Sequence, residues 1–174
     1  LNIAYFEQSI EGFQSNVFSG TGFNLENAGK ETHKGVEFDG MFALSESLIL
    51  GLSGIAIDPV YDSFVNGTCD TTGLAEARYQ CEPGKSTVDL SGLQPAGVHE
   101  LSINANAVYS FALSGDVQGF FRVEYVHEKD INIADLIPFS LANRGTDNLN
   151  ASLGFSSENG GWDAMLWGRN LTDH

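Results

Sequence analysis

The sequence predicts an all-β protein, an antiparallel meander of about seven long strands. Apolar and polar residues alternate in one segment after another, which places the apolar side chains of each strand on one face. No segment shows the spacing of an amphipathic helix. Long and short connections between the segments alternate along the chain. These three observations predict strands that follow one another in chain order, each with an apolar and a polar face.

The clearest strand is predicted at residues 99–113. From Leu101 to Leu113 every odd position is apolar, whereas Ser102, Asn104 and Asn106 are polar. At about 100° per residue these apolar positions would scatter around a helix, but at about 180° they share one face. The segment is also long for a soluble protein, in which strands usually have about five or six residues.

The remaining strands are predicted along the whole length of the chain. Alternation is clear in "KGVEFDGMF", "VQGFFRVEYVHE" and "NLNASLGFS", and it is blurred in the first two apolar runs. In chain order the six further strands are expected at residues 1–13, 34–42, 48–57, 117–128, 148–156 and 162–171.

The lengths of the connections distinguish two architectures. The long connections begin near Gln14, cover residues 62–97 and cover residues 130–147, whereas the short ones lie at 45–47, 113–116 and 156–161. A meander that crosses an outer membrane has short periplasmic turns and long outer loops. A Greek-key sandwich has no reason for such an asymmetry.

Aromatic residues gather near the short connections. Tyr109 and Phe111 lie close to one, Phe155 and Trp162 flank another, and Phe42 precedes the third. This matches an aromatic girdle at one membrane interface. We therefore expect a segment of a transmembrane β-barrel, with a secreted β-sandwich as the alternative, in which apolar faces pack on each other. Bacterial barrels have an even number of strands, so seven would belong to a larger wall.

Composition excludes several functions. Eight Lys and Arg against 23 Asp and Glu give a net charge of −15 without a basic cluster, so nucleic-acid binding is excluded. No apolar run is long enough for a transmembrane helix.

Cys69 and Cys81 lie in a segment rich in turn-forming residues and are expected to form a disulfide, with two free thiols as the alternative. Two cysteines are too few for a zinc site.

Four blocks of sequence resemble the TonB-dependent outer-membrane receptors. They are "LNIAYFEQSIEGFQ", the pair Asn27-Ala28-Gly29 and Lys34-Gly35-Val36-Glu37, "VDLSGLQPAGVHELSINANAVYSF", and "WDAMLWGRNLTD" with Arg169-Asn170-Leu171-Thr172-Asp173. They stand in the family's order and span most of the chain. One departure is "PAGVHEL", where many relatives have a tryptophan after the proline.

The resemblance implies the C-terminal part of a barrel of about 22 strands that encloses a plug. Such a protein imports a scarce solute across the bacterial outer membrane, most often a ferric siderophore, with cobalamin, haem and oligosaccharides as other possibilities. Its expected partners are outer-membrane lipid and, through the plug, the TonB energy complex. The plug, the earlier strands and the last strand are expected outside this chain, which leaves an unpaired edge at residues 162–171. A passive porin is the alternative.

Neither catalysis nor a cofactor is expected. The histidines His33, His99, His127 and His174 are dispersed, so no metal site is predicted. The best candidate for ligand contact is the connection at residues 62–97, because long ordered loops are usually functional. Its Phe64, Arg78 and Tyr79 could stack on a planar ligand or pair with an anionic one. The alternative is a surface loop without a ligand.

Overall fold

A computed structural model of the chain describes residues 1–18, 23–27, 29–70, 79–133 and 143–172. Every regular element in them is a β-strand. Among these residues there is no helix with the length and hydropathy needed to cross a membrane.

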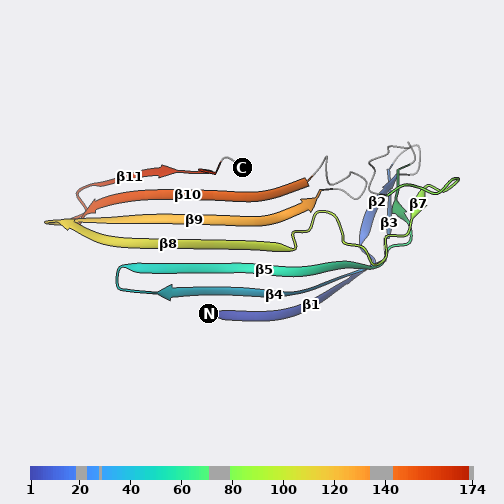
Figure 1. Cartoon of the computed structure of the whole chain (residues 1–174), viewed down its shortest axis with the longest axis horizontal. Helices are drawn as coiled ribbons and strands as arrows, with labels where there is room; N and C mark the ends of the chain where they lie inside the picture. Colours follow the sequence, from blue (N-terminus) through green and yellow to red (C-terminus); the bar gives the residue numbers. More distant parts are fainter. Residues whose placement is uncertain (19–22, 28, 71–78, 134–142, 173–174) are drawn as a thin grey trace.

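Seven strands form one antiparallel sheet, in the order β1-β4-β5-β8-β9-β10-β11 (Figure 1). They are β1 (Asn2–Glu11), β4 (Lys30–Ala43), β5 (Leu48–Ser63), β8 (Leu101–Ser114), β9 (Val117–Asn132), β10 (Asn143–Ser157) and β11 (Asp163–Gly168). Each long strand pairs with the next long strand of the chain. The predicted all-β meander of seven strands is therefore confirmed.

Two small hairpins belong to the long connections. Strands β2 (Gln14–Phe18) and β3 (Phe23–Asn27) pair between β1 and β4, and strands β6 (Gly67–Thr68) and β7 (Thr87–Val88) pair between β5 and β8. Figure 1 shows both hairpins at the same end of the sheet, on the right of the view. We call this end the loop end, and the opposite end, which carries the short connections, the turn end.

The short connections form tight turns with local hydrogen bonds. The Ser45 hydroxyl accepts hydrogen bonds from the backbone N–H groups of Ser47 and Leu48, at 3.2 and 3.1 Å. The next turn contains Gly115, whose φ of 59° favours glycine. The backbone N–H of Glu158 donates to the carbonyl of Asp116 at 2.7 Å and so joins two neighbouring turns.

The sheet extends further toward the loop end than the apolar pattern predicts. Strand β9 continues to Asn132 and β10 begins at Asn143, so the connection predicted at residues 130–147 is shorter. The register shifts between Arg144 and Thr146, where Gly145 faces two residues of β9. A Cβ at Gly145 would lie 1.9 Å from Asp130 Oδ1, so a larger residue here would require the Asp130 side chain to move. Backbone pairing thus continues past the apolar zone, where alternation no longer marks the strand.

The seven-stranded sheet is a single layer, and its apolar core is small. The buried apolar residues are Tyr61, Phe64, Cys69, Leu90 and Ile131, of which Tyr61 and Ile131 stand near the ends of β5 and β9 and the other three in the connection between β5 and β8. Within the described residues no second sheet packs on the seven-stranded one. The structure therefore differs from the alternative of a β-sandwich, in which the apolar faces of two sheets form the core.

Candidate functional site

The two faces of the sheet differ in chemistry from β4 to β10. Neighbouring residues in register across β4, β5, β8, β9 and β10 form one apolar row: Phe42, Leu50, Ala107, Val123 and Ala151. The adjacent row points to the other face and is mostly polar: Met41, Gly51, Asn106, Glu124 and Asn150. Successive side chains of a strand alternate between faces, so the sheet has an apolar face and a polar face.

The apolar face is open to its surroundings. Leu52, Tyr109 and Phe121 keep 41%, 47% and 44% of their surface exposed. An apolar groove of about 450 Å³ runs over Ala105 and Ala107 between larger neighbours. A continuous exposed apolar surface of this kind marks contact with a membrane or a partner.

The apolar face ends in aromatic residues at the turn end and in charged residues toward the loop end. At the turn end the rings of Phe111 and Phe155 meet edge to face at 6.1 Å. Between them lies Gly119, where a Cβ would meet the Phe111 ring at 2.6 Å. Toward the loop end the same face carries the ion pair Lys34–Glu7 at 3.3 Å and a hydrogen bond between His127 Nδ1 and Asp147 Oδ1 at 2.9 Å. An apolar band between an aromatic and a charged border is typical of a strand that crosses a bilayer.

At the loop end, residues 62–97 fold around a small core of their own. Phe64 and Leu90 are 2% and 1% exposed and pack with Tyr61. Phe13, from the end of the first long strand, stacks on Tyr61 with 5.6 Å between the ring centroids. We call these residues, together with the partly buried Tyr79 and Val88, the loop core. It joins the first and second long connections.

The structure contains a disulfide between Cys69 and Cys81, with 5.1 Å between the Cα atoms. Next to it, the backbone N–H of Asp70 donates to the carbonyl of Tyr79 at 2.8 Å, and the N–H of Cys81 donates to the carbonyl of Asp70 at 3.1 Å. The disulfide joins the two ends of the segment 69–81 covalently, and the two backbone hydrogen bonds lie next to it.

The predicted ligand residues differ in their placement. Phe64 is buried in the loop core, where it packs against Tyr61 and Leu90. Tyr79 packs against the same core and is only partly buried. Arg78 lies outside the described residues. Sequence alone did not separate Phe64 from the other two, because an aromatic residue in a loop has the same pattern whether it supports the loop or binds a ligand.

Hydrogen bonds shift the pKa of two carboxyl groups in this outer segment. The Ser91 hydroxyl and the Ser91 backbone N–H, which donates at 2.9 Å, stabilise the charged form of Asp89 and lower its pKa below the ordinary value. Lys85 lowers the pKa of Glu82 in the same way, by a hydrogen bond and by its charge. The Ser91 hydroxyl oxygen also accepts from the backbone N–H of Phe64 at 2.9 Å, which links Asp89 to the loop core.

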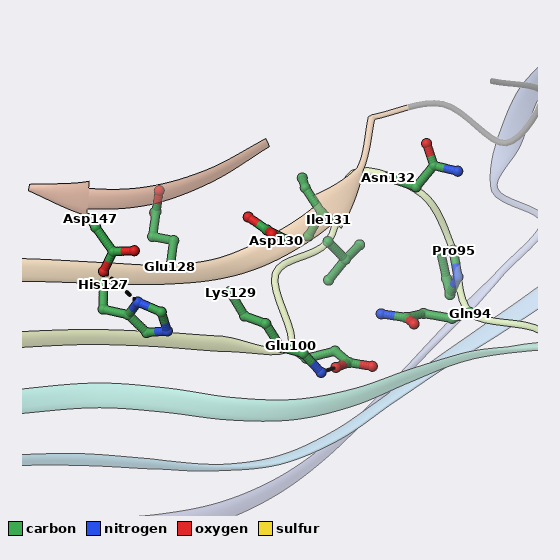
Figure 2. A pocket seen from close by; sticks show the side chains of 11 residues that line it. Gln94, Pro95, Glu100, His127, Glu128, Lys129, Asp130, Ile131, Asn132 and Asp147 are labelled. Carbon is green, nitrogen blue, oxygen red and sulfur yellow. Dashed lines mark hydrogen bonds and ion pairs between the residues drawn. The ribbon is translucent and has the colours of Figure 1, made fainter. Parts of the chain in front are cut away.

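Beside the loop core, a polar cavity of about 610 Å³ opens at the loop ends of β9 and β10. Figure 2 shows Gln94 and Pro95 on one side of it, the ion pair of Lys129 with Glu100 in the middle, and His127 with Asp147 at the far side. Its charged groups can hydrogen-bond a polar solute. Among the residues that the structure describes, no group of side chains could hold a metal ion.

Sequence analysis did not identify the residues of this polar cavity. They come from the connection before β8 and from two strands, and only the pairing of those strands brings them together. The available signal was weak: polar residues such as Glu100 and Lys129 stand just beyond the apolar part of their strands.

A single antiparallel sheet with one apolar and one polar face is typical of the outer-membrane β-barrel proteins, in which such a sheet forms the wall of the barrel. A family profile described as "TonB dependent receptor-like, beta-barrel" matches residues 1–171. The chain therefore belongs to this family, as its sequence blocks predicted. Membership supports a place in TonB-dependent transport across the outer membrane of Gram-negative bacteria, by a transporter rather than an enzyme. No curated protein and no solved structure matches the chain significantly.

Proposed function

We propose that this chain forms part of the wall of an active importer that binds a scarce solute at the cell surface, a ferric siderophore being the first candidate. The observation that carries the proposal is the open apolar face, bordered by aromatic and charged residues, on a chain of this family. The polar face then lines the lumen through which the solute passes.

The sheet is, in this proposal, one section of a closed barrel of about 22 strands that holds a plug. Within the described residues β1 and β11 each pair on one side only, and an open edge inside a bilayer would leave backbone groups without partners. Further strands of the same receptor would satisfy them. Energy would reach the plug through the TonB complex.

We further propose that residues 62–97 contact the solute at the outer surface. Supporting this are the loop core, which fixes the segment against the sheet, and the disulfide, which closes its tip. Arg78 and Tyr79 lie in the part closed by the disulfide and are the proposed contacts, whereas Phe64 holds the segment in place.

A deletion tests the role of this segment. Removing residues 67–85 from the intact receptor should abolish binding of the solute to whole cells, while the receptor remains in the outer membrane. Replacing Arg78 and Tyr79 by alanine is the finer version, with Val65→Ala as control, because Val65 is 59% exposed and lies outside the closed loop. Unchanged uptake by the deletion variant would remove these residues from the site.

A second experiment separates the importer from a passive porin. Uptake of a labelled ferric siderophore is measured in cells with and without the inner-membrane energy complex. The external concentration of the siderophore is kept low, so that accumulation inside the cell requires energy. An importer accumulates the solute only when the complex is present. Uptake that survives its loss would favour the porin, and energy-dependent uptake of cobalamin, haem or an oligosaccharide instead would correct the solute alone.

A further inference from the structure

The polar face carries a second cavity, of about 490 Å³, where β9, β10 and β11 lie side by side (Figure 1). Arg122, Ser152 and Trp167 stand in register across these three strands and share the polar face. Arg169 also lines the cavity, just beyond the end of β11. The cavity lies away from the loop core and belongs to the wall itself.

The cavity concentrates positive charge in an acidic protein. Two of the eight Lys and Arg residues of a chain with net charge −15 line it, Arg122 and Arg169. Neither guanidinium forms an ion pair within the described part of the chain. The one carboxylate of the lining, Glu124, accepts a hydrogen bond from Asn104 Nδ2 at 3.3 Å. Two guanidiniums thus line the cavity without a carboxylate partner among the residues that the structure describes.

Apolar side chains interrupt the polar face at this place. Trp167 and Met165 point to the same side as Arg122 and Ser152, where the alternation of the other strands puts polar residues. Their exposed fractions are 59% and 60%. The guanidinium carbon of Arg169 lies 5.2 Å from the centre of the Trp167 ring, a cation–π contact that holds both groups at the cavity. An exposed indole next to two guanidiniums is suited to a ligand that is both planar and anionic.

From this arrangement we infer a binding subsite on the lumen wall for a small solute that carries carboxylate groups on a planar apolar skeleton. The fork of N–H groups of a guanidinium matches a carboxylate with two parallel hydrogen bonds. The indole face of Trp167 offers a stacking surface to the skeleton. The Ser152 hydroxyl and the Asn150 carboxamide line the same wall. The inference rests on the proposed function, because the solute reaches this face only through the lumen.

Phthalate and its uncharged analogue phthalamide test the subsite in the full receptor, purified in detergent, by calorimetry. Phthalate should bind at least about tenfold more tightly than phthalamide, because only its carboxylates form charge-assisted hydrogen bonds. Arg122→Gln and Arg169→Gln should each weaken phthalate binding by about tenfold or more. Arg122→Lys should restore part of it, since charge returns without the fork. Trp167→Ala should weaken both ligands.

Arg144→Gln is the matched control, because Arg144 is an exposed arginine at the loop end of β10 and does not line the cavity. Heat-modifiable migration on a denaturing gel shows whether each variant is folded. Equal binding of phthalate and phthalamide, or unchanged binding by folded Arg122→Gln and Arg169→Gln variants, overturns the subsite.

The experiment also distinguishes a solute in the cavity from an acidic segment of the receptor itself. If phthalate does not bind and a photo-crosslinker at position 122 captures an acidic segment of the receptor itself, the guanidiniums hold protein and the inference fails. Energy-dependent uptake, measured separately, decides the proposed function. Uptake that persists while phthalate fails to bind removes the subsite and leaves the importer in place.

Discussion

The sheet and the loop core are stabilised in opposite ways. The sheet turns an apolar face outward and buries few of its side chains, so its stability depends on the bilayer and on further pairing. The loop core buries Phe64 and Leu90 and carries the disulfide, as a small secreted domain does. The strands thus expose apolar side chains, as a protein in a bilayer does, whereas the loop end buries them, as a protein in water does. Substitutions should therefore act differently in the two regions.

The largest effect is expected in the loop core, for Phe64→Ala. The ring is 2% exposed, and removal of a buried phenylalanine costs about 3–5 kcal/mol. Residues 62–97 should become sensitive to protease while the strands stay protected, which limited proteolysis of the receptor in detergent would show. Val65→Ala, at an exposed position next to it, should leave the protease pattern unchanged. A global loss of folding would contradict the separation of the two regions.

A charge on the apolar face should destabilise the sheet almost as much. Ala107→Arg places a guanidinium in the middle of the apolar face and should cost up to about 4 kcal/mol, because charges near the bilayer midplane are poorly solvated. Asn106→Arg, one residue earlier on the polar face, is the matched control and should cost far less. Equilibrium unfolding of the receptor in phospholipid vesicles measures both. Equal costs would mean that the two faces do not differ in environment, and a larger cost for Asn106→Arg would mean that the faces are assigned the wrong way round.

Loss of the disulfide should have a smaller effect, confined to the loop core. Replacing Cys69 and Cys81 by serine removes a cross-link between positions 12 residues apart, which is worth roughly 3 kcal/mol when the segment is otherwise able to unfold. The measured loss of stability will be smaller if the packing of the loop core keeps the segment folded without the disulfide. Hydrogen exchange should speed up in residues 67–93 and stay unchanged in β8 and β9. A reducing agent should reproduce the effect in the unsubstituted receptor.

The smallest expected effect concerns acid. Hydrogen bonds from Ser91 lower the pKa of Asp89, so the folded segment binds fewer protons than the unfolded one. The stabilisation is complete above the ordinary carboxyl pKa and is lost as the pH falls through the lower, folded pKa. Protease resistance of residues 62–97 should therefore decline at low pH. In the Asp89→Asn variant the loss of protease resistance at low pH should be smaller, because position 89 no longer titrates. The same dependence on pH in the variant and in the unsubstituted receptor would show that Asp89 does not contribute.

Much of the fold was predictable, for reasons that particular strands make clear. In β8, alternation from Leu101 to Leu113 identified the strand because one face needs apolar side chains and the other does not. The limits of β9 and β10 were missed because the outer residues up to Asn132 and from Asn143 are held by backbone hydrogen bonds, which leave no trace in polarity. The burial of Phe64 was missed because its partners Leu90 and Phe13 are distant from it in the sequence.

The sequence by itself determined the all-β class, the order of the strands, their apolar and polar faces and the division into a turn end and a loop end. These are properties of short segments, since period and turn chemistry act over a few residues. Only the tertiary structure decided which residues meet. The register places Arg122 and Trp167 on either side of Ser152, Lys129 forms an ion pair with Glu100, and the loop end packs Phe13 on Tyr61. Cavities formed by several strands depend on that register, and a shift of one residue would turn every such side chain to the other face.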